Sequence, residues 1–411
     1  MNEQDFFEFL KKQFQSTMNI NKIFKLITES VPDADMNLCC INNTIQSLAD
    51  IEKEGYEAYT KNSQYYLPNK LYKYFPNKWI TEQGFKKPRN YSLEALKNNT
   101  VYLQSPEEFD DTYDSNIHIK YKEYEKIRLH IYCQRCGFKI SDNETLEEMY
   151  YKLSEAFQRA WEASSNDLTS IFMEIPKSEF EKVSNLLFAN YVEFERNRIL
   201  EWNSIADISL QEEFKWEYCI RYAIHKEYDD YVKYLRNALR ISCFTTSPHK
   251  QLMWAGHYAD FHRGFCVEYK VDRNNAEYEN IFKNIFPVIY CKSRPDMTER
   301  ILNFKDDIYN EEKLWNIYFH GVLRKSIDWI YQNEWRFLQP KDNDPTKYNY
   351  KFYPISKVYL GCRMDNRDRK DIIKICDDNK IPYIFVRRAA NTFEIEDCDK
   401  QCETCSHYLQ R

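Results

Sequence analysis

The sequence predicts an α+β protein with a mixed sheet and large helical additions. Short runs of β-branched and aromatic residues alternate with helical patterns, which is typical of this class. The chain has 411 residues, more than one domain usually holds, and its hydrophobic content of 43% is enough for a proper core. We expect a helical extension at 1–66, a core made of 67–120 and 240–396, a helical insertion at 121–239 and a cysteine-rich tail at 397–411.

Composition excludes several functions. Glycine is scarce, at 7 residues, and neither G-x-G-x-x-G nor G-x-x-x-x-G-K-[ST] occurs, so a glycine-rich phosphate loop is excluded. The formal net charge is -6, with 58 basic and 64 acidic residues, which gives no overall basic bias toward nucleic acid. The acidic start lacks the basic region of a secretory signal, and no run of about 18 apolar residues is present to span a membrane. We therefore expect a cytoplasmic protein with no membrane contact.

The N-terminal extension is predicted to be helical. Apolar residues recur at helical spacing up to Pro32, which interrupts the run, and a second helix is expected from about Thr44 to Lys61. The polar residues of this extension form no cluster. Packing or contact with a partner is therefore its expected role, rather than chemistry.

The insertion is also predicted to be helical. Thr145 and Glu148 form a capping box, because a Thr at the N-cap and a Glu three residues later satisfy two backbone amides. Ser178 and Glu181 repeat this pattern, and apolar stripes at helical spacing follow both pairs. Such stripes form hydrophobic cores, so the insertion is expected to pack as a helical unit.

The core alternates short strands with helices. Its strands are expected at 71–75, 100–103, 240–247, 264–269, 287–291, 329–338, 357–361, 383–386 and 392–395. Its helices are expected at 92–97, 251–261, 298–326 and 366–377.

The segment 329–338 carries the strongest indication of chemistry. Half of its residues are β-branched or aromatic types that favour a strand, and Gln332 and Glu334 lie two apart within it. In a strand these two side chains point to the same face, which puts a carboxylate on a largely apolar surface. A buried carboxylate is costly unless it is paired or used. Glu334 therefore either pairs with a nearby Arg or Lys at a sheet edge or takes part in catalysis.

Four segments together resemble a bacterial family of unknown function, DUF2971. They are Leu71–Tyr74, Phe109–Asp114, Leu252–Tyr258 continued by Gly264–Tyr269, and Lys325 with Trp329 before Glu334–Arg336. The resemblance covers about 67–390 without the insertion. The family has Asn where this chain has Asp110, Pro where it has Thr112, and Glu where it has Gln332.

A second resemblance implies a mechanism. Leu71–Lys73, Phe244–Ser247 and Gln332–Glu334 resemble the basic, Ser-Thr-Ser and Gln/Glu-x-Glu strands of ADP-ribosyltransferases, in the same order along the chain. The resemblance implies an ADP-ribosyltransferase-like core that binds NAD, with Lys where that family has Arg or His. It implies catalysis by Glu334 and Gln332. It also implies NAD contacts from Tyr72, Lys73, Ser242, Thr245, Thr246, Ser247, Trp254 and Tyr258.

The implied reaction breaks the bond between nicotinamide and ribose, through an oxocarbenium-like centre that Glu334 would stabilise. Arg336, two residues further on, is another candidate site residue. The reaction would modify a target, protein or nucleic acid, or would release ADP-ribose as an NAD glycohydrolase does. Proteins that resemble this family often look like parts of toxin or phage-defence systems, so we expect a bacterial antiviral effector. A regulatory partner would bind the helical extension or the insertion.

Two other classes of function stay open. Asp110, Asp111 and Asp114 form an acidic cluster of the kind that binds Mg²⁺ in a nuclease, with His257 or His262 as the base. Asp-rich loops also serve simply as turns. The third class is a non-enzymatic sensor or partner module, which the extra helices favour. NAD consumption, Mg²⁺-dependent cleavage of nucleic acid, or neither would separate the three classes.

Cysteine is frequent, at 13 residues. Cys398, Cys402, Cys405 and His407 supply three thiols and an imidazole within ten positions, a spacing that suits one structural zinc ion. The C-x-x-C motif at Cys133–Cys136 is a second source of ligands for such a site. The tail also resembles an iron–sulfur signature, and a tail that binds no metal is the remaining alternative.

Overall fold

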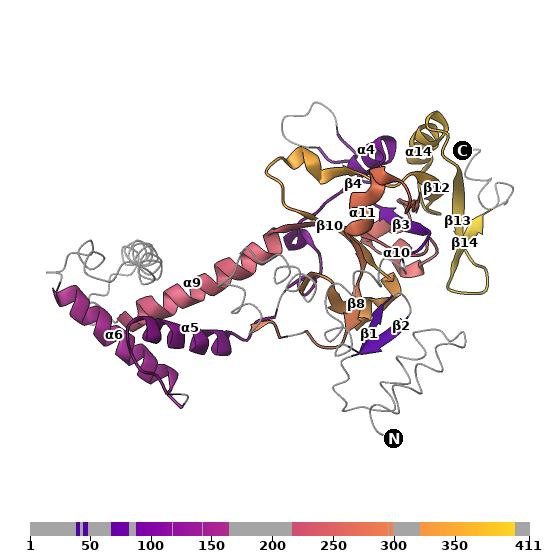
Figure 1. The fold of residues 1–411 in the computed structure, drawn as a ribbon. Helices are drawn as coiled ribbons and strands as arrows, with labels where there is room; N and C mark the ends of the chain where they lie inside the picture. The colour runs from indigo at the N-terminus through magenta and orange to yellow at the C-terminus, as the bar shows by residue number, and fades with distance from the viewer. Residues whose placement is uncertain are drawn as a thin grey trace, which may run out of the picture. The chain divides into compact units, whose positions relative to one another are not determined.

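The computed structural model describes residues 38–41, 44–47, 67–81, 88–116, 118–141, 143–163, 216–294, 296–298 and 321–398. Over this part of the chain the structure is mixed α/β, with antiparallel and parallel strand pairs in its sheets (Figure 1). The chain divides into two compact units. Unit 1 consists of Met1–Ile117, Arg236–Pro295 and Asn310–Arg411, and unit 2 consists of His118–Leu235 and Asp296–Tyr309.

A five-stranded sheet in unit 1 has the order β14-β13-β12-β6-β3. Its strands are β3 Lys70–Phe75, β6 Phe265–Lys270, β12 Ile355–Leu360, β13 Tyr383–Arg388 and β14 Ile395–Cys398. Neighbouring strands are antiparallel, except that β12 and β13 run parallel and are joined by helix α14, Asn366–Asp378. A crossover helix is the usual connection between parallel neighbours.

A three-stranded antiparallel sheet lies beside it in the order β5-β10-β7. Its strands are β5 Leu239–Phe244, β10 Trp335–Pro340 and β7 Ile285–Pro287. A single bridge between Tyr72 and Thr245 connects β3 to the end of β5, and both backbone hydrogen bonds of this bridge form. The two sheets therefore meet where the segments 72–75 and 243–245 run side by side.

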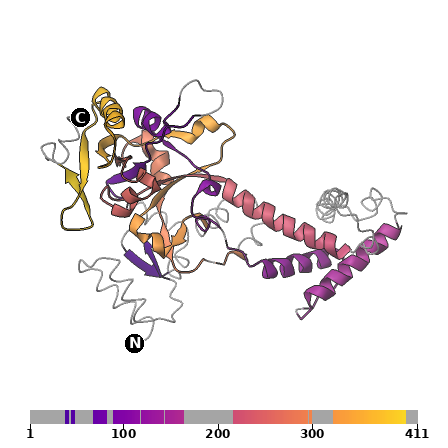
Figure 2. The same cartoon turned by 180° about the vertical axis from the view of Figure 1, so that it is seen from behind.

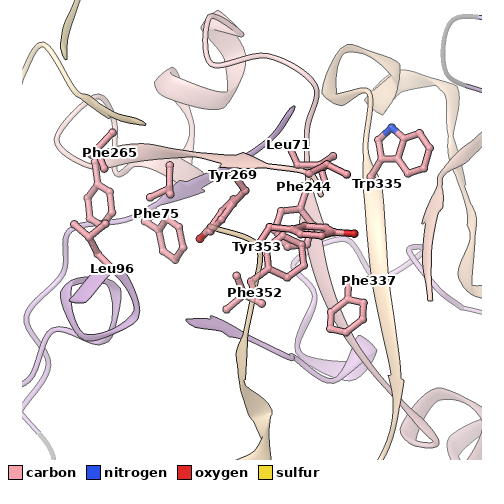
Figure 3. Close-up of a cluster of buried hydrophobic side chains, with 14 of the residues drawn as sticks. Leu71, Phe75, Leu96, Phe244, Phe265, Tyr269, Trp335, Phe337, Phe352 and Tyr353 are labelled. Atoms are coloured by element: carbon pink, nitrogen blue, oxygen red, sulfur yellow. The ribbon is translucent and has the colours of Figure 1, made fainter. Parts of the chain in front are cut away.

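One hydrophobic core joins both sheets to the helices α4 (Tyr91–Asn98), α11 (Glu279–Lys283) and α14. Aromatic rings fill much of it, and the rings of Phe244 and Phe352 stack with centroids 4.4 Å apart (Figure 3). Figure 2 shows α4 and α14 close together, as in Figure 1. A second cluster, which contains Tyr74 and Trp254, covers the opposite face of the five-stranded sheet. Both faces of that sheet are thus buried by side chains.

The remaining elements of unit 1 are short. They are β1 Leu38–Ile41, β2 Thr44–Ser47, β4 Thr100–Tyr102, η1 Pro106–Glu108, α10 Gln251–Ala255, η3 His257–Ala259, η4 Ala276–Tyr278, β8 Ile289–Cys291, β9 Arg324–Ser326, η5 Ile327–Gln332, η6 Pro345–Tyr348 and β11 Asn349–Lys351. They include a sheet of order β2-β1-β8-β9 and the pair β11-β4.

Unit 2 contains the helices α5 Tyr121–Arg135, α6 Leu146–Ala163 and α9 Trp216–Asn237 (Figures 1 and 2). The predicted capping box is confirmed, because the Thr145 amide and hydroxyl donate to Glu148 and the Glu148 amide donates to the Thr145 hydroxyl. Glu227 of α9 is buried and accepts hydrogen bonds from Arg128 and Tyr132 of α5. Charged and aromatic side chains thus fasten α9 to α5.

Two predicted helices are wrong in part. Thr44–Ser47 is the strand β2, although a helix was expected from Thr44, because it pairs with β1, which in turn pairs with β8. Residues 48–61 of that expected helix lie outside the described residues. The helix expected at 298–326 ends instead in the strand β9, which pairs in parallel with β8, while 299–320 lie outside the described residues. In both cases sheet pairing overrides local helical spacing.

Three further boundaries differ. The expected strand at 329–338 begins only at Trp335, because Ile327–Gln332 forms the 3₁₀ helix η5. The expected helix at 251–261 ends at Ala255, and the backbone then passes through three consecutive left-handed residues, 260–262. The last strand lies at 395–398 instead of 392–395, where it pairs with the end of β13.

Candidate functional site

Lys325, in the short strand β9, lies at the centre of the candidate site. Its ammonium donates hydrogen bonds to Asp114 Oδ2 at 2.9 Å, Gln332 Oε1 at 2.9 Å and Glu334 Oε2 at 2.8 Å. An ammonium has three protons, so each proton has an acceptor. The Lys325 side chain is only 5% exposed, which makes this a buried ionic contact.

Arg336 of β10 completes the arrangement from the other side. Its Nε donates to Glu334 Oε1 and its terminal nitrogen donates to the Asp114 carboxylate, both at 2.7 Å. It also donates to the Ser115 hydroxyl at 2.8 Å and to the Val322 carbonyl. Asp114, Lys325, Glu334 and Arg336 therefore form a buried cluster of two anions and two cations, here called the four-charge network.

Local backbone geometry explains why these side chains meet. Ser326 begins η5 by accepting a hydrogen bond from the Asp328 amide, and Asn333 ends it in the left-handed conformation at φ 43°. Asn tolerates that conformation better than most residues. The turn delivers Gln332 and Glu334 to the same ammonium although they do not share a strand. The predicted strand face is therefore wrong, although the two side chains do lie side by side on one ammonium.

Balanced charge keeps the network ionised. Burial acts to raise the pKa of Glu334, but Arg336 and Lys325 outweigh it and hold that pKa far below its ordinary value. Burial acts to lower the pKa of Lys325, but the carboxylates of Glu334 and Asp114 hold it above its ordinary value. Glu334, Lys325 and Arg336 thus stay charged at neutral pH. The network contains two acidic and two basic side chains, so its formal charges cancel.

Gln332 and Tyr258 form a hydrogen-bonded pair at the edge of the four-charge network. The Gln332 side-chain amide donates to the Tyr258 hydroxyl at 3.1 Å, and the Thr245 hydroxyl donates to the Gln332 backbone carbonyl. Tyr258 is half-buried, and burial is the main cause of its raised pKa, so it keeps its proton. The ring of the half-buried Trp329 lies 5.2 Å from the Lys325 ammonium. An amide, a hydroxyl and aromatic rings thus border the charged centre.

The acidic residues of the Mg²⁺ hypothesis do not form one cluster. Asp110 pairs with His257 at 2.8 Å on the surface, and Asp111 accepts the Tyr113 amide at 2.8 Å as part of a turn. Asp114 is buried in the four-charge network. Where the structure describes the chain, no three His, Cys, Asp or Glu side chains are grouped to hold a metal ion. A carboxylate metal site at 110–114 is therefore not formed in this arrangement.

Two of the expected NAD contacts lie away from the site. Ser242 faces Phe337 across the β5–β10 register, whereas Thr245 is an odd number of residues away and points to the other face. Trp254 is fully buried in the second cluster, with its indole donating to the Pro248 carbonyl at 2.7 Å. Stacking of Trp254 on a ligand is therefore excluded in this arrangement.

The other expected contacts surround the junction of the two sheets. Lys73 donates to the Cys243 carbonyl at 3.1 Å, beside the Phe244 ring, and burial lowers its pKa. Tyr72 donates to Glu268 at 3.1 Å on the opposite face of β3. Thr246 and Ser247 are half-buried and follow β5. Strand alternation puts Lys73 on the face of the main core, and the negative charge of Glu334 still reaches it and acts to raise its pKa.

The cysteine predictions are only partly within the described residues. Cys398 ends β14 and is fully buried, while Cys402, Cys405 and His407 lie outside the described residues. At Cys133–Cys136 burial raises the pKa of both thiols, and the Cys133 thiol lies 3.7 Å from the Met149 carbonyl. These two thiols are therefore protonated at neutral pH in the metal-free protein.

Three contributors were missed by sequence reasoning. Lys325 was noted only as part of a resembling segment, and Ser115 and Tyr290 were not noted at all. The Tyr290 hydroxyl accepts the Glu334 amide at 2.9 Å, so it fixes the backbone of the site. The requirement that a buried carboxylate be paired was the available signal, and it pointed to some Lys or Arg without saying which.

Comparison with known proteins finds a family model that matches part of the chain. Residues 253–337 match the model of a family described as a protein of unknown function, DUF2971, and this supports the resemblance. The matched stretch contains Tyr258, Lys325, Gln332, Glu334 and Arg336. No curated protein and no solved structure matches the chain. Among the described helices, none has the length and apolar character needed to cross a membrane.

Proposed function

We propose that this chain cleaves NAD between nicotinamide and ribose, as an ADP-ribosyltransferase or an NAD glycohydrolase. The observation that supports this is convergence: Asp114, Tyr258, Lys325 and the Gln332–Arg336 segment, far apart in sequence, meet in one hydrogen-bonded system. Such convergence of polar groups on a rigid sheet is typical of sites that position a substrate.

In this proposal Gln332 and Tyr258 contact the substrate. The Gln332 amide has its oxygen held by Lys325 and one N–H directed at Tyr258, so its orientation is fixed. A fixed amide beside aromatic rings suits a planar carboxamide such as nicotinamide. Glu334 would supply negative charge on the same side, where the cationic transition state develops.

The ion pairs restrict what Glu334 does. Lys325 and Arg336 occupy its two oxygens, so its charge is largely neutralised in this state. The reaction would require Lys325 to release Glu334 Oε2. The same ammonium also holds the Gln332 side chain, so the two contacts of Lys325 are linked. Substrate contacts to Gln332 would thus weaken the ion pair between Lys325 and Glu334.

A non-enzymatic module is the second candidate, and one observation favours it. Every proton of the Lys325 ammonium has a protein acceptor, as expected of a network that only stabilises the fold. In that case the helical extension or unit 2 would bind the partner, and the chain would act as a sensor. In either case we propose that the protein is an effector of a bacterial defence system and acts in the cytoplasm.

The test is nicotinamide release from NAD by the purified full chain, followed by chromatography. We expect turnover, and we expect Gln332→Ala and Tyr258→Phe to reduce it by on the order of 10²–10³. Tyr353→Phe is the matched control, because the Tyr353 hydroxyl is buried and has no hydrogen-bond partner among the described residues. Thermal melts would show that each variant is folded.

Two results would contradict the proposal. If the folded chain leaves NAD intact, with and without cell extract to supply a target, the non-enzymatic module is favoured. If NAD is cleaved but the Gln332 and Tyr258 variants match the control, the reaction takes place elsewhere on the chain.

A further inference from the structure

His262 is a buried titratable residue that the proposed reaction does not use. It is 9% exposed, and its Nδ1 has no hydrogen-bond partner among the described residues. It ends a run of three left-handed residues, with φ values of 46°, 54° and 68° at Asp260, Phe261 and His262. Each such residue strains the backbone, and a nitrogen buried without a partner adds a further cost in free energy. A bound acceptor or donor at Nδ1 would remove the second cost.

Two arginines lie near His262, one at the end of β13 and one just after the end of β12. Arg388 is the last residue of β13, and it shares a strand face with Ile384 and Val386, which pack in the cluster of Trp254. The His262 ring stacks on Trp254 with centroids 6.4 Å apart and planes 9° from parallel. Arg388 and His262 therefore lie on the same face of the five-stranded sheet.

Arg363 follows the end of β12 and is tied directly to His262. Its amide donates to the His262 carbonyl at 3.0 Å. Gly361 allows this approach, since a Cβ there would lie 2.2 Å from the His262 carbonyl oxygen and 2.6 Å from that of Gly264. The close contact of these backbones holds the start of the arginine-bearing segment against the backbone of His262.

The two arginines near His262 lack a balancing anion among the described residues. Burial lowers the pKa of His262, and the positive charges of Arg363 and Arg388 lower it further. Arg363 and Arg388 are exposed, and no carboxylate in the described part of the chain pairs with either guanidinium. In contrast, the neighbouring Arg387 pairs with Glu396 at 2.7 Å. The uncompensated positive charge would favour an anion.

The position in the fold also suits a ligand. β12 and β13 are parallel neighbours, and Arg363 and Arg388 both lie at their carboxyl ends. Ligands of open α/β sheets bind in this place, outside the carboxyl ends of parallel strands. Guanidinium groups match phosphate oxygens in pairs of parallel hydrogen bonds, and an imidazole supplies one more donor.

We propose that His262, Arg363 and Arg388 form a binding site for the phosphate of a small molecule, either free phosphate or a nucleotide. Nδ1 of His262 would donate to one phosphate oxygen, and the two guanidinium groups would hold the others. This site does not depend on the proposed cleavage of NAD, because it uses none of the residues of the four-charge network.

Calorimetric titration of the purified full chain with inorganic phosphate, ADP and adenosine tests the proposal. We expect phosphate and ADP to bind and adenosine to bind far more weakly. Arg363→Ala and Arg388→Ala should each weaken binding about ten- to a hundredfold, as expected for loss of a hydrogen bond to a charged group. His262→Gln should have a similar effect, and a thermal melt would show whether it is folded.

Arg387→Ala is the matched control, since this side chain is the next on β13 but points to the other face. Its affinity for phosphate should equal that of the unsubstituted chain. Tighter binding of ADP than of phosphate would assign the site to nucleotides, and equal binding would assign it to free phosphate. Absence of millimolar binding by both, or an equal loss in Arg387→Ala, would overturn the proposal.

Discussion

Replacing Glu334 by Gln should lower the stability of the fold as well as any catalytic activity. The substitution keeps the shape of the side chain but removes one anion from a balanced set of two anions and two cations. Lys325 and Arg336 would then share Asp114 alone, at a place where the Glu334 side chain is only 4% exposed. Breaking a buried pair in this way costs about 3–5 kcal/mol. We expect the free energy of unfolding to fall by about that amount.

Urea titration followed by tryptophan fluorescence measures this loss. Trp335 is 1% exposed and adjacent to Glu334, so its emission reports on the unfolding of this region. Glu396→Gln is the control, because it breaks the exposed pair with Arg387 and should cost less than about 1 kcal/mol. The double substitution of Glu334 by Gln and Lys325 by Met restores the charge balance, and should cost less than the sum of the two single changes.

A loss below about 1 kcal/mol in Glu334→Gln would refute this reasoning, since it would mean that the network carries little of the fold. The expected destabilisation also changes how activity data are interpreted. Loss of NAD turnover in this variant would not by itself assign a catalytic role to Glu334. For that reason the Gln332 and Tyr258 variants are better tests of chemistry.

Three further predictions concern other parts of the chain. Burial acts to raise the pKa of Asp296, but hydrogen bonds from Thr298 and Lys120 lower it to about 2, so its stabilising effect is full above about pH 4 and is lost as the pH falls through 2. Asp296→Asn should lower Tm at pH 7, and its difference from the unsubstituted chain should shrink from pH 4 to pH 2; a constant difference would contradict this. Gly361→Ala should cost roughly 1–3 kcal/mol in urea titrations, because its methyl group would meet a backbone carbonyl; unchanged stability would be inconsistent with the close approach. Elemental analysis should find about one zinc per chain if the cysteine-rich tail binds it through four ligands, whereas full reaction of the tail thiols with a thiol reagent and no metal would exclude the site.

The strands of the core were largely predictable because their signals are local. The runs at 71–75, 264–269 and 383–386 were found within about two residues, since aromatic and β-branched residues end at clear breaks. Segment 327–332 was missed because its apolar side chains suit a strand as well as a 3₁₀ turn. The signals for the turn were the Ser326–Asp328 cap and an Asn able to end it in the left-handed conformation.

For the site, the sequence predicted only that the carboxylate of Glu334 needs a positively charged partner. Burial of Glu334 demanded a cation, and the two cations that pair with it, Arg336 and Lys325, lie 2 and 9 residues away. The second anion, Asp114, lies 222 residues from Arg336, and no local pattern connects the two. The placement of Ser242 could have been anticipated, because Ser242 and Thr245 are three residues apart in the strand expected at 240–247 and would point to opposite faces. Strand parity was therefore an unused constraint on the expected NAD contacts.

The long separation within the four-charge network also has a consequence for synthesis of the chain. Asp114 and Arg336 are separated by 222 residues, so at about 5–20 residues per second Asp114 leaves the ribosome roughly 10–40 s before its partner. During that time its carboxylate has no permanent counter-ion, and the segment that carries it must stay in water. The main core has the same delay, because it includes residues from Leu67 to Cys398. The main core of unit 1 is therefore complete only after residue Cys398 has been made.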